Sequence, residues 1–222
     1  MMDLGGAGAG ANERPTIVPL GDRAVLVRFA QTLSEEANRR AVGLAARLDA
    51  DPPEGVEEIA PGLVSVLVRT RAGGDFWRLS GELRLRLEDA VTSAAGADHR
   101  VEVSFDGDDL DEVAQLAGLS RAHFIERHNA APLRVLATGF APGFVYCGFH
   151  EPELVVPRRE QVRAMVPPGT VLFAAGQTAV AATPIRTGWH VIGRTTFQNF
   201  DPMHDPPTIL APGDRVQFVE LP

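Results

Sequence analysis

The chain has 222 residues, of which 45% are hydrophobic and 23% are charged, so it can bury a substantial core as one large domain or two small ones. Its net charge of −8 argues against non-specific binding of nucleic acid, which needs a basic face. The sequence contains no apolar run of about 18 residues, the length that would predict a membrane span. We therefore expect neither a nucleic acid nor a membrane as a partner.

The use of cysteine and lysine is unusual. Cys147 is the single cysteine, which excludes an internal disulfide and fits a reducing cytoplasm. There is no lysine, so all 21 basic residues are arginines. A Walker-type lysine, a Schiff-base lysine and a Ser–Lys dyad are therefore excluded. An anionic ligand would have to be bound by arginines, backbone N–H groups or helix N-termini.

The first half of the chain alternates between strand and helix patterns. Residues 1–14 are rich in glycine and alanine and predict a flexible leader, and residues 15–105 predict one α/β domain. The expected elements are a strand at 24–29, a helix from Leu33 to Leu48 capped by Thr32, strands at 56–59 and 63–68, a helix capped by Asp75 with an apolar face reaching Val91, and a strand at 101–105. This βαββαβ order is typical of ferredoxin-like domains.

Residues 106–222 have a different texture. Asp108 is expected to cap a short helix that ends at Gly118, and Ser120 a second helix that ends near His128. Short apolar runs broken by glycine and proline follow, at 134–136, 170–174, 190–192 and 215–219. These runs predict a compact β-barrel, so the expected fold class is α+β with two domains.

A glycine- and aromatic-rich stretch, GFAPGFVYCGF, occupies residues 139–149. Its glycines permit close backbone approach, and Phe140, Phe144 and Tyr146 could line a pocket, although such a string alone is more often a packed hairpin. Arg158 and its neighbour Arg159 follow a proline and are suited to binding a carboxylate or phosphate.

Two later segments carry further polar candidates. Gln177 and Thr178 could orient an amide by hydrogen bonds, although a Gly-Gln-Thr tripeptide is also an ordinary turn. Trp189 and His190 offer an aromatic wall and an imidazole, although a lone histidine is more often structural. No spacing matches a common zinc pattern, no Gly-x-Ser-x-Gly elbow is present, and nothing indicates a reactive Cys147. We expect no metal site.

Taken together, the segments resemble one known family. It comprises allophanate hydrolase subunit 1, the B subunit of 5-oxoprolinase and the sporulation kinase inhibitor KipI. The resemblance covers nearly the whole chain after the leader and rests on LGDRAV (20–25), DDLDEVA (108–114), GLS (118–120), His128, GFAPGFVY (139–146), PRR (157–159), VPPGTV (166–171), GQT (176–178), GWHVIGRT (188–195), FDP (200–202) and PGDRVQF (212–218). It implies a small α/β N-terminal domain followed by a cyclophilin-like β-barrel.

The resemblance also implies a function. Members work with a larger homologous subunit, and the 5-oxoprolinase members add a third subunit and open 5-oxo-L-proline to glutamate with ATP and Mg. We therefore expect the smaller subunit of a two-component, ATP-dependent amide- or lactam-processing hydrolase, with ATP bound in the assembled complex. The alternative is a KipI-like regulator that binds and inhibits a sensor histidine kinase.

On this interpretation, Arg158, Gln177 and His190 are the catalytic candidates, because they could bind and polarise an activated amide. The residues expected to contact the substrate are Gly139, Phe140, Pro142, Gly143, Phe144, Thr178, Trp189 and Arg194.

The sequence departs from the family pattern near these residues. Family members usually continue the Gly-Gln-Thr segment with Gly-Val-Tyr-Pro and precede the tryptophan with Pro-Gly-Gly. Here residues 179–182 are AVAA and residues 186–188 are RTG, so a tyrosine hydroxyl and a glycine-defined backbone path are missing. Either the substrate differs from 5-oxoproline or the activity is lost.

Overall fold

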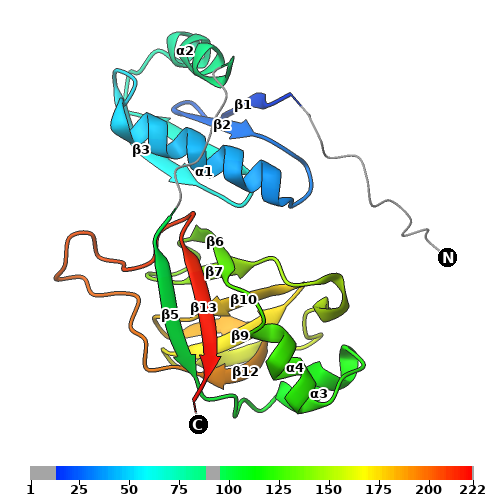
Figure 1. The fold of residues 1–222 in the computed structure, drawn as a ribbon. Coiled ribbons are helices and arrows are strands. Elements are labelled where there is room, and N and C mark those ends of the chain that lie inside the picture. The colour runs from blue at the N-terminus through cyan, green and yellow to red at the C-terminus, as the bar shows by residue number, and fades with distance from the viewer. Residues whose placement is uncertain (1–13, 89–95, 222) are drawn as a thin grey trace. The chain divides into compact units, whose positions relative to one another are not determined.

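The computed structural model describes residues 14–88 and 96–221. The chain divides into two compact units, Met1–Ala94 and Ala95–Pro222, and each is described by itself (Figure 1). The leader expected at residues 1–14 lies, except for Arg14, outside the described residues.

The first unit is a four-stranded antiparallel sheet with two helices. Its elements are β1 (Thr16–Leu20), β2 (Ala24–Arg28), α1 (Glu35–Ala50), β3 (Val56–Pro61), β4 (Ser65–Thr70) and α2 (Phe76–Glu88), and the strand order is β1-β2-β4-β3. Alternate residues of β2 and β4, such as Val25, Val27, Val66 and Val68, are fully buried. They pack with the apolar faces of both helices, as period-2 and period-3.6 patterns require.

The predicted caps of these helices were half right. The N-cap of α1 is Ser34, whose hydroxyl accepts the N–H of Ala37 at 3.2 Å, so the prediction of Thr32 was wrong. Asp75 does cap the second helix, accepting backbone N–H groups from Trp77 at 2.9 Å and Arg78 at 3.1 Å. The predicted extension of this helix to Val91 lies outside the described residues.

The second unit is built on a curled seven-stranded sheet. Its elements are β5 (Asp98–Val103), α3 (Leu110–Leu116), α4 (Arg121–His128), β6 (Leu133–Thr138), β7 (Val145–Gly148), the 3-10 turn η1 (Pro152–Leu154), β8 (Arg163–Val166), β9 (Thr170–Ala174), β10 (Gln177–Val180), β11 (Ile185–Thr187), β12 (His190–Arg194) and β13 (Arg215–Glu220). The sheet order is β12-β9-β10-β7-β6-β13-β5, and β11 and β8 form a separate ribbon.

The curl brings the two edges of this sheet together. Ser104, just after β5, exchanges backbone hydrogen bonds of 2.8 and 3.0 Å with Arg194 at the end of β12. Gly193 is needed at this point, because a Cβ there would lie 2.4 Å from the Ser104 carbonyl oxygen. The predicted strands of this half of the chain all form, with bounds that differ by at most a few residues.

The strand expected to complete the first domain belongs to the second sheet. β5, at Asp98–Val103, runs parallel to β13 over six residue pairs, side by side with it in Figure 1. In the first unit, the edge beside β2 where a ferredoxin-like fourth strand would lie is occupied by β1. The predicted ferredoxin-like βαββαβ domain over 15–105 is therefore not what forms, and the second unit begins about ten residues earlier than predicted.

Helices α3 and α4 pack against each other, and α3 packs against β12 (Figure 1). Ser120 caps α4 as predicted, accepting the N–H of His123 at 3.3 Å. The N-cap of α3 is Asp109 rather than the predicted Asp108, and its side chain makes no capping hydrogen bond. No helix of the described residues has the length and apolar character to cross a bilayer.

The boundary can be tested with two fragments. Residues 96–222 should unfold cooperatively, whereas residues 106–222, which the sequence-based boundary would give, should not. The shorter fragment lacks β5, whose Val101 and Val103 are buried in the core, and leaves one edge of β13 unpaired. Urea unfolding followed by circular dichroism measures the difference, and equal cooperativity of both fragments would contradict it.

Candidate functional site

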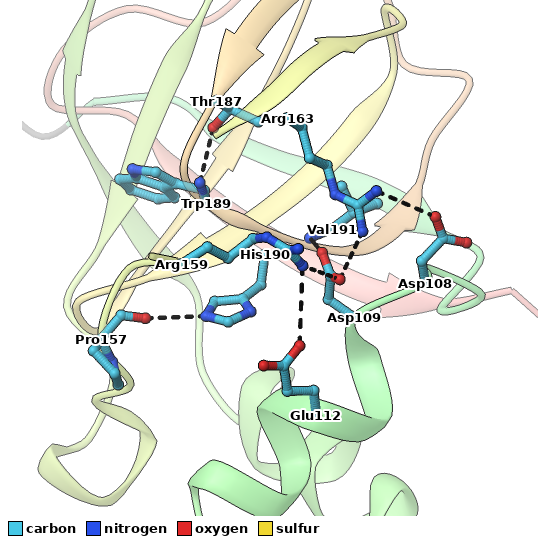
Figure 2. Close-up of polar contacts among 10 residues, drawn as sticks. All are labelled: Asp108, Asp109, Glu112, Pro157, Arg159, Arg163, Thr187, Trp189, His190 and Val191. Carbon is cyan, nitrogen blue, oxygen red and sulfur yellow. Dashed lines mark hydrogen bonds and ion pairs between the residues drawn. The ribbon is translucent and has the colours of Figure 1, made fainter. Parts of the chain in front are cut away.

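A buried carboxylate organises one end of the second unit. One oxygen of Asp109 accepts hydrogen bonds from Arg159 and from Arg163, the latter at 2.6 Å, and the other accepts the backbone N–H of Val191 at 2.7 Å (Figure 2). The side chain of Asp109 is only 5% exposed. It therefore ties the start of α3 to β8, β12 and the segment before β8, instead of capping its own helix.

The electrostatics of Asp109 favour the ionised form. Burial by itself raises the pKa of this carboxyl, but the hydrogen bonds from Arg163 and Val191 and the charges of both arginines outweigh burial and hold the pKa below its ordinary value. Arg159 also lies 3.9 Å from Glu112, and Arg163 lies 3.5 Å from Asp108. Both arginines are thus neutralised by carboxylates of this chain.

Arg158 is held differently. The carbonyl of Pro157, before it, accepts a hydrogen bond from Nε2 of His190 at 3.0 Å, and the N–H of Arg159, after it, donates to the carbonyl of Gly188 at 2.8 Å. These two hydrogen bonds hold the backbone at Arg158 next to Gly188 and His190, the residues that flank Trp189. The exposed guanidinium lies over the Trp189 ring, with Cζ 5.8 Å from the ring centroid.

Arg158 and His190 line one groove of about 320 Å³, together with Glu112, Leu116, Pro157, Arg159, Glu160 and Gln161. Among residues 14–88 and 96–221, no carboxylate lies within ion-pair distance of the Arg158 guanidinium. This arginine therefore has donors free for an external anion.

The catalytic role predicted for His190 does not follow from its environment. The residue is 2% exposed, and its Nδ1 is buried without a hydrogen-bond partner among the described residues. Nε2 donates to the Pro157 carbonyl, which can only accept, and Nδ1 is shielded from solvent. The geometry makes His190 a residue that positions Arg158.

The aromatic residues expected to line a pocket lie next to one another. Phe140, Phe144, Tyr146 and Trp189 form a row in which successive ring centroids lie 5.2, 4.8 and 5.8 Å apart, all in edge contacts. Arg158 lies at the Trp189 end of this row. The row extends from exposed Phe140 to Arg158, for which no carboxylate partner is present among the described residues.

The backbone around the start of this row is fixed by packing. Gly143 has φ of +68°, and a Cβ there would lie 2.4 Å from the Cβ of Phe200. Its carbonyl accepts the side-chain amide of Asn199 at 2.9 Å. Gly139 and Pro142, both exposed, precede Gly143 in the connection between β6 and β7. The glycines shape a hairpin, which is the alternative that the sequence left open.

Gln177 and Thr178 point to opposite faces of β10. Gln177 pairs with Ala174, which packs in the cluster around Trp189, whereas Thr178 pairs with Phe173 of the main core. Paired residues in an antiparallel sheet share a face and successive residues alternate, so the two side chains cannot bind the same ligand from one side. Gln177 shares the face of Tyr146, and Thr178 does not.

Thr178 belongs to a polar network inside the core. Its hydroxyl lies 2.8 Å from Nε2 of His128 and 2.8 Å from Nε2 of His150, and Nδ1 of His128 lies 2.8 Å from the side-chain oxygen of Asn129. Because the amide oxygen can only accept, His128 donates from Nδ1, accepts the Thr178 hydroxyl at Nε2, and leaves His150 as donor to that hydroxyl. Both nitrogens of His128 and the hydroxyl of Thr178 are thereby paired.

This network resembles a nucleophile, base and orienting amide, but the surroundings argue for a structural role. Thr178 is 0% exposed and His128 is 1% exposed. Burial lowers the pKa of His128 to about 4, and burial with the charge of His128 lowers that of His150 to about 2. Burial also raises the pKa of Cys147 to about 12, so this thiol stays protonated at neutral pH.

Arg194 lies apart from Arg158. Its guanidinium pairs with Asp106 at 2.6 Å and borders another groove, of about 270 Å³, beside Arg163 and Met165.

The residues that sequence reasoning missed are Asp109, Glu112 and the histidine His150. An aspartate just before a helix is usually interpreted as the helix N-cap. The signal for another role was that two aspartates, Asp108 and Asp109, precede this helix, and only one of them can be the cap.

Comparison with known proteins identifies the fold and the lineage. Residues 15–210 match the family model for the carboxyltransferase domain, subdomain C and D. The chain belongs to this family. It is 30% identical to the B subunit of 5-oxoprolinase from Bacillus subtilis, over 94% of this chain and 93% of that protein. It is 34% identical to the B subunit of 5-oxoprolinase from Escherichia coli O157:H7, over 90% and 93%.

Solved structures agree. The protein TTHA0988 is 36% identical with a TM-score of 0.78, and the match covers 90% of this chain but 40% of that one. A conserved protein of Pyrococcus horikoshii, PH0987, is 34% identical with a TM-score of 0.54, over 93% and 97%. The urea amidolyase of Kluyveromyces lactis, at 16% identity and a TM-score of 0.74, shares the fold over 93% of this chain and 15% of its own.

The role of Asp109 predicts a large loss of stability in Asp109→Asn. The substitution leaves two arginines, about a quarter exposed, without their shared carboxylate, and we expect a loss of about 2–3 kcal/mol in the free energy of unfolding. Asp108→Asn is the matched control, because Asp108 is 80% exposed and should lose under about 0.5 kcal/mol. Urea denaturation measures both, and similar losses would refute the assignment.

The histidine network predicts destabilisation by acid. With a folded pKa of about 4, His128 binds fewer protons in the folded than in the unfolded protein, so stability is complete above pH 6.5 and falls as the pH drops. At pH 5, His128 should account for a loss of about 2 kcal/mol. The free energy of unfolding is measured with urea above pH 6.5 and at pH 5. The loss between the two pH values should be smaller in His128→Gln than in wild type, and unchanged in His123→Gln, which alters an exposed residue of the same helix. A loss as large in His128→Gln as in wild type would rule the network out as its source.

Proposed function

We propose that this chain is the smaller subunit of an ATP-dependent hydrolase complex that opens a cyclic amide such as 5-oxo-L-proline. The main support is that the relatives matched over at least 90% of both chains are B subunits of 5-oxoprolinase. The term subunit in those names supports an enzyme that works in a complex. The proposal also includes the cyclophilin-like character of the curled sheet, which the resemblance implies, and action in the cytoplasm.

The partner is proposed to be a larger subunit, of the type of the 5-oxoprolinase C subunit or of allophanate hydrolase subunit 2, with a place for a third subunit. The chain covers 40% of TTHA0988, so more than half of that protein has no counterpart here. A separate chain could supply such a part.

Arg158 carries the proposed chemistry of this subunit. Its guanidinium is exposed, fixed over Trp189 and free of carboxylates among the described residues, so it can bind a carboxylate or a phosphoryl group through two parallel hydrogen bonds. Arg159 and Arg163 are paired with Asp109, so their guanidiniums do not compete with Arg158 for an external anion. The groove beside Arg158 thus has one available cation.

The groove does not fit ATP. A triphosphate with Mg needs several cationic or backbone donors, whereas this groove presents one unpaired guanidinium beside Glu112 and Glu160. We therefore propose that ATP and Mg bind elsewhere in the assembled complex.

Arg158→Lys tests the proposal. The complex is reconstituted with the larger subunit, and ATP hydrolysis dependent on 5-oxo-L-proline is measured. Lysine keeps the charge but loses the paired donors, so the apparent affinity for the substrate should fall about 10- to 100-fold with little change in melting temperature. Arg100→Lys, an exposed arginine on β5, is the control.

Three results would count against the proposal. Unchanged kinetics in Arg158→Lys and Arg158→Ala would remove this residue from the site. A larger subunit that never co-elutes with this chain would exclude the two-component enzyme. Binding to a sensor histidine kinase, without lactam-dependent ATP hydrolysis, would instead support the KipI-like alternative.

A further inference from the structure

The Tyr146 and Arg158 side chains both lie against Trp189. Its ring contacts Trp189 at a centroid distance of 5.8 Å and an interplanar angle of 62°, and the Arg158 guanidinium lies over the Trp189 ring, also at 5.8 Å from its centroid. Burial raises the pKa of the Tyr146 phenol, while the positive charge of Arg158 acts in the opposite direction. The phenol ring and the guanidinium thus lie against the same indole ring.

The Tyr146 hydroxyl is available for a ligand. Within residues 14–88 and 96–221 it has no hydrogen-bond partner, yet it is not among the buried unpaired polar atoms, so its oxygen reaches the surface. Its ring is fixed by edge contact with Phe144 at 4.8 Å. A half-buried phenol usually finds a partner, so an unpaired one on a fixed ring is a donor in place before a ligand arrives.

Tyr146 and Arg158 also differ in what they can bind. The guanidinium prefers a carboxylate or phosphoryl group, which it can hold through two bonds. The phenol O–H, a neutral donor, suits a carbonyl oxygen. Tyr146 packs against an apolar cluster that includes Phe144, Leu172 and Trp189, so the surroundings of its ring are largely apolar. An exposed cation beside a half-buried neutral donor fits a small molecule with both an anionic group and an amide carbonyl.

We propose that Tyr146 and Arg158 form one binding face for a cyclic amide that bears a carboxylate, with Arg158 holding the carboxylate, Tyr146 donating to the ring carbonyl and Trp189 supporting both side chains. This inference deepens the proposed function and rests on it for the substrate class. It adds Tyr146 as the residue that distinguishes a lactam from an amino acid lacking the carbonyl.

The chain offers a direct optical test. Its two tryptophans are Trp77 and Trp189, and Trp77 is 81% exposed in the first unit, so Trp77→Phe leaves Trp189 as the single indole reporter. The full-length variant is titrated with 5-oxo-L-proline, with L-proline, which has the carboxylate but no ring carbonyl, and with 2-pyrrolidinone, which has the carbonyl but no carboxylate. The Trp189 emission should respond most tightly to 5-oxo-L-proline.

Two further substitutions in this background separate the contacts. Tyr146→Phe keeps the ring and removes only the hydroxyl. It should lower the affinity for 5-oxo-L-proline and for 2-pyrrolidinone about 3- to 10-fold and leave the affinity for L-proline unchanged. Arg158→Lys should lower the affinity for the two ligands that carry a carboxylate, 5-oxo-L-proline and L-proline, about 10-fold or more. The affinity for 2-pyrrolidinone should not change. Tyr146→Phe with wild-type affinity for all three ligands would overturn the inference, as would the absence of any emission change.

The same variants in the reconstituted complex separate this inference from the proposed function. Lactam-dependent ATP hydrolysis with an unchanged KM in Tyr146→Phe would retain the proposed function and reject the role of Tyr146. The opposite result is also informative. If Tyr146→Phe loses lactam binding but the wild-type complex hydrolyses no ATP when lactam is added, the binding face is supported and the proposed reaction is rejected. A rise in KM with little change in kcat is the expected result.

Discussion

The ionised carboxylate of Asp109 is the interaction on which the functional end of this molecule depends. An almost completely buried charge is costly unless hydrogen bonds and opposite charges compensate for it, and here two guanidiniums and one backbone N–H do so. Each donor comes from a different segment of the fold. The carboxylate thus fixes the relative positions of α3, β8, β12 and the residues around Arg158.

This arrangement sorts arginines that the sequence presents as equivalent. Arg158 and Arg159 are neighbours after Pro157, but the loop turns Arg159 inward to Asp109 and leaves Arg158 outside over Trp189. The bond from His190 to the Pro157 carbonyl and the bond from Arg159 to the Gly188 carbonyl enforce that alternation. One charge is used for structure, and the next remains available for a ligand. In a chain without lysine, such sorting decides where an anion can bind.

The sequence predicted much of the fold because local patterns decide it. The strand at 170–174 was predicted residue for residue, and the caps at Ser120 and Asp75 follow from side-chain chemistry. Pairing partners are not local, so a strand pattern near 101–105 could not show that β5 joins β13 more than 100 residues later. For the site, the sequence analysis placed Gln177 and Thr178 together, whereas they lie on opposite faces of β10. The burial of His190 and the inward turn of Arg159 depend on tertiary contacts, which no local pattern shows.

The departure from the family pattern at residues 179–182 gains meaning from the sheet register. Ala181 is fully buried in the cluster around Trp189, on the same face of the sheet as Tyr146. The tyrosine usual in the family would therefore place its ring on this face, where alanine now stands. Removing one phenol leaves Tyr146, the single tyrosine of the chain, as the only phenolic donor that this face can offer a ligand. Loss of the usual tyrosine is thus compatible with a retained lactam-binding face, provided that recognition of the carbonyl depends on Tyr146.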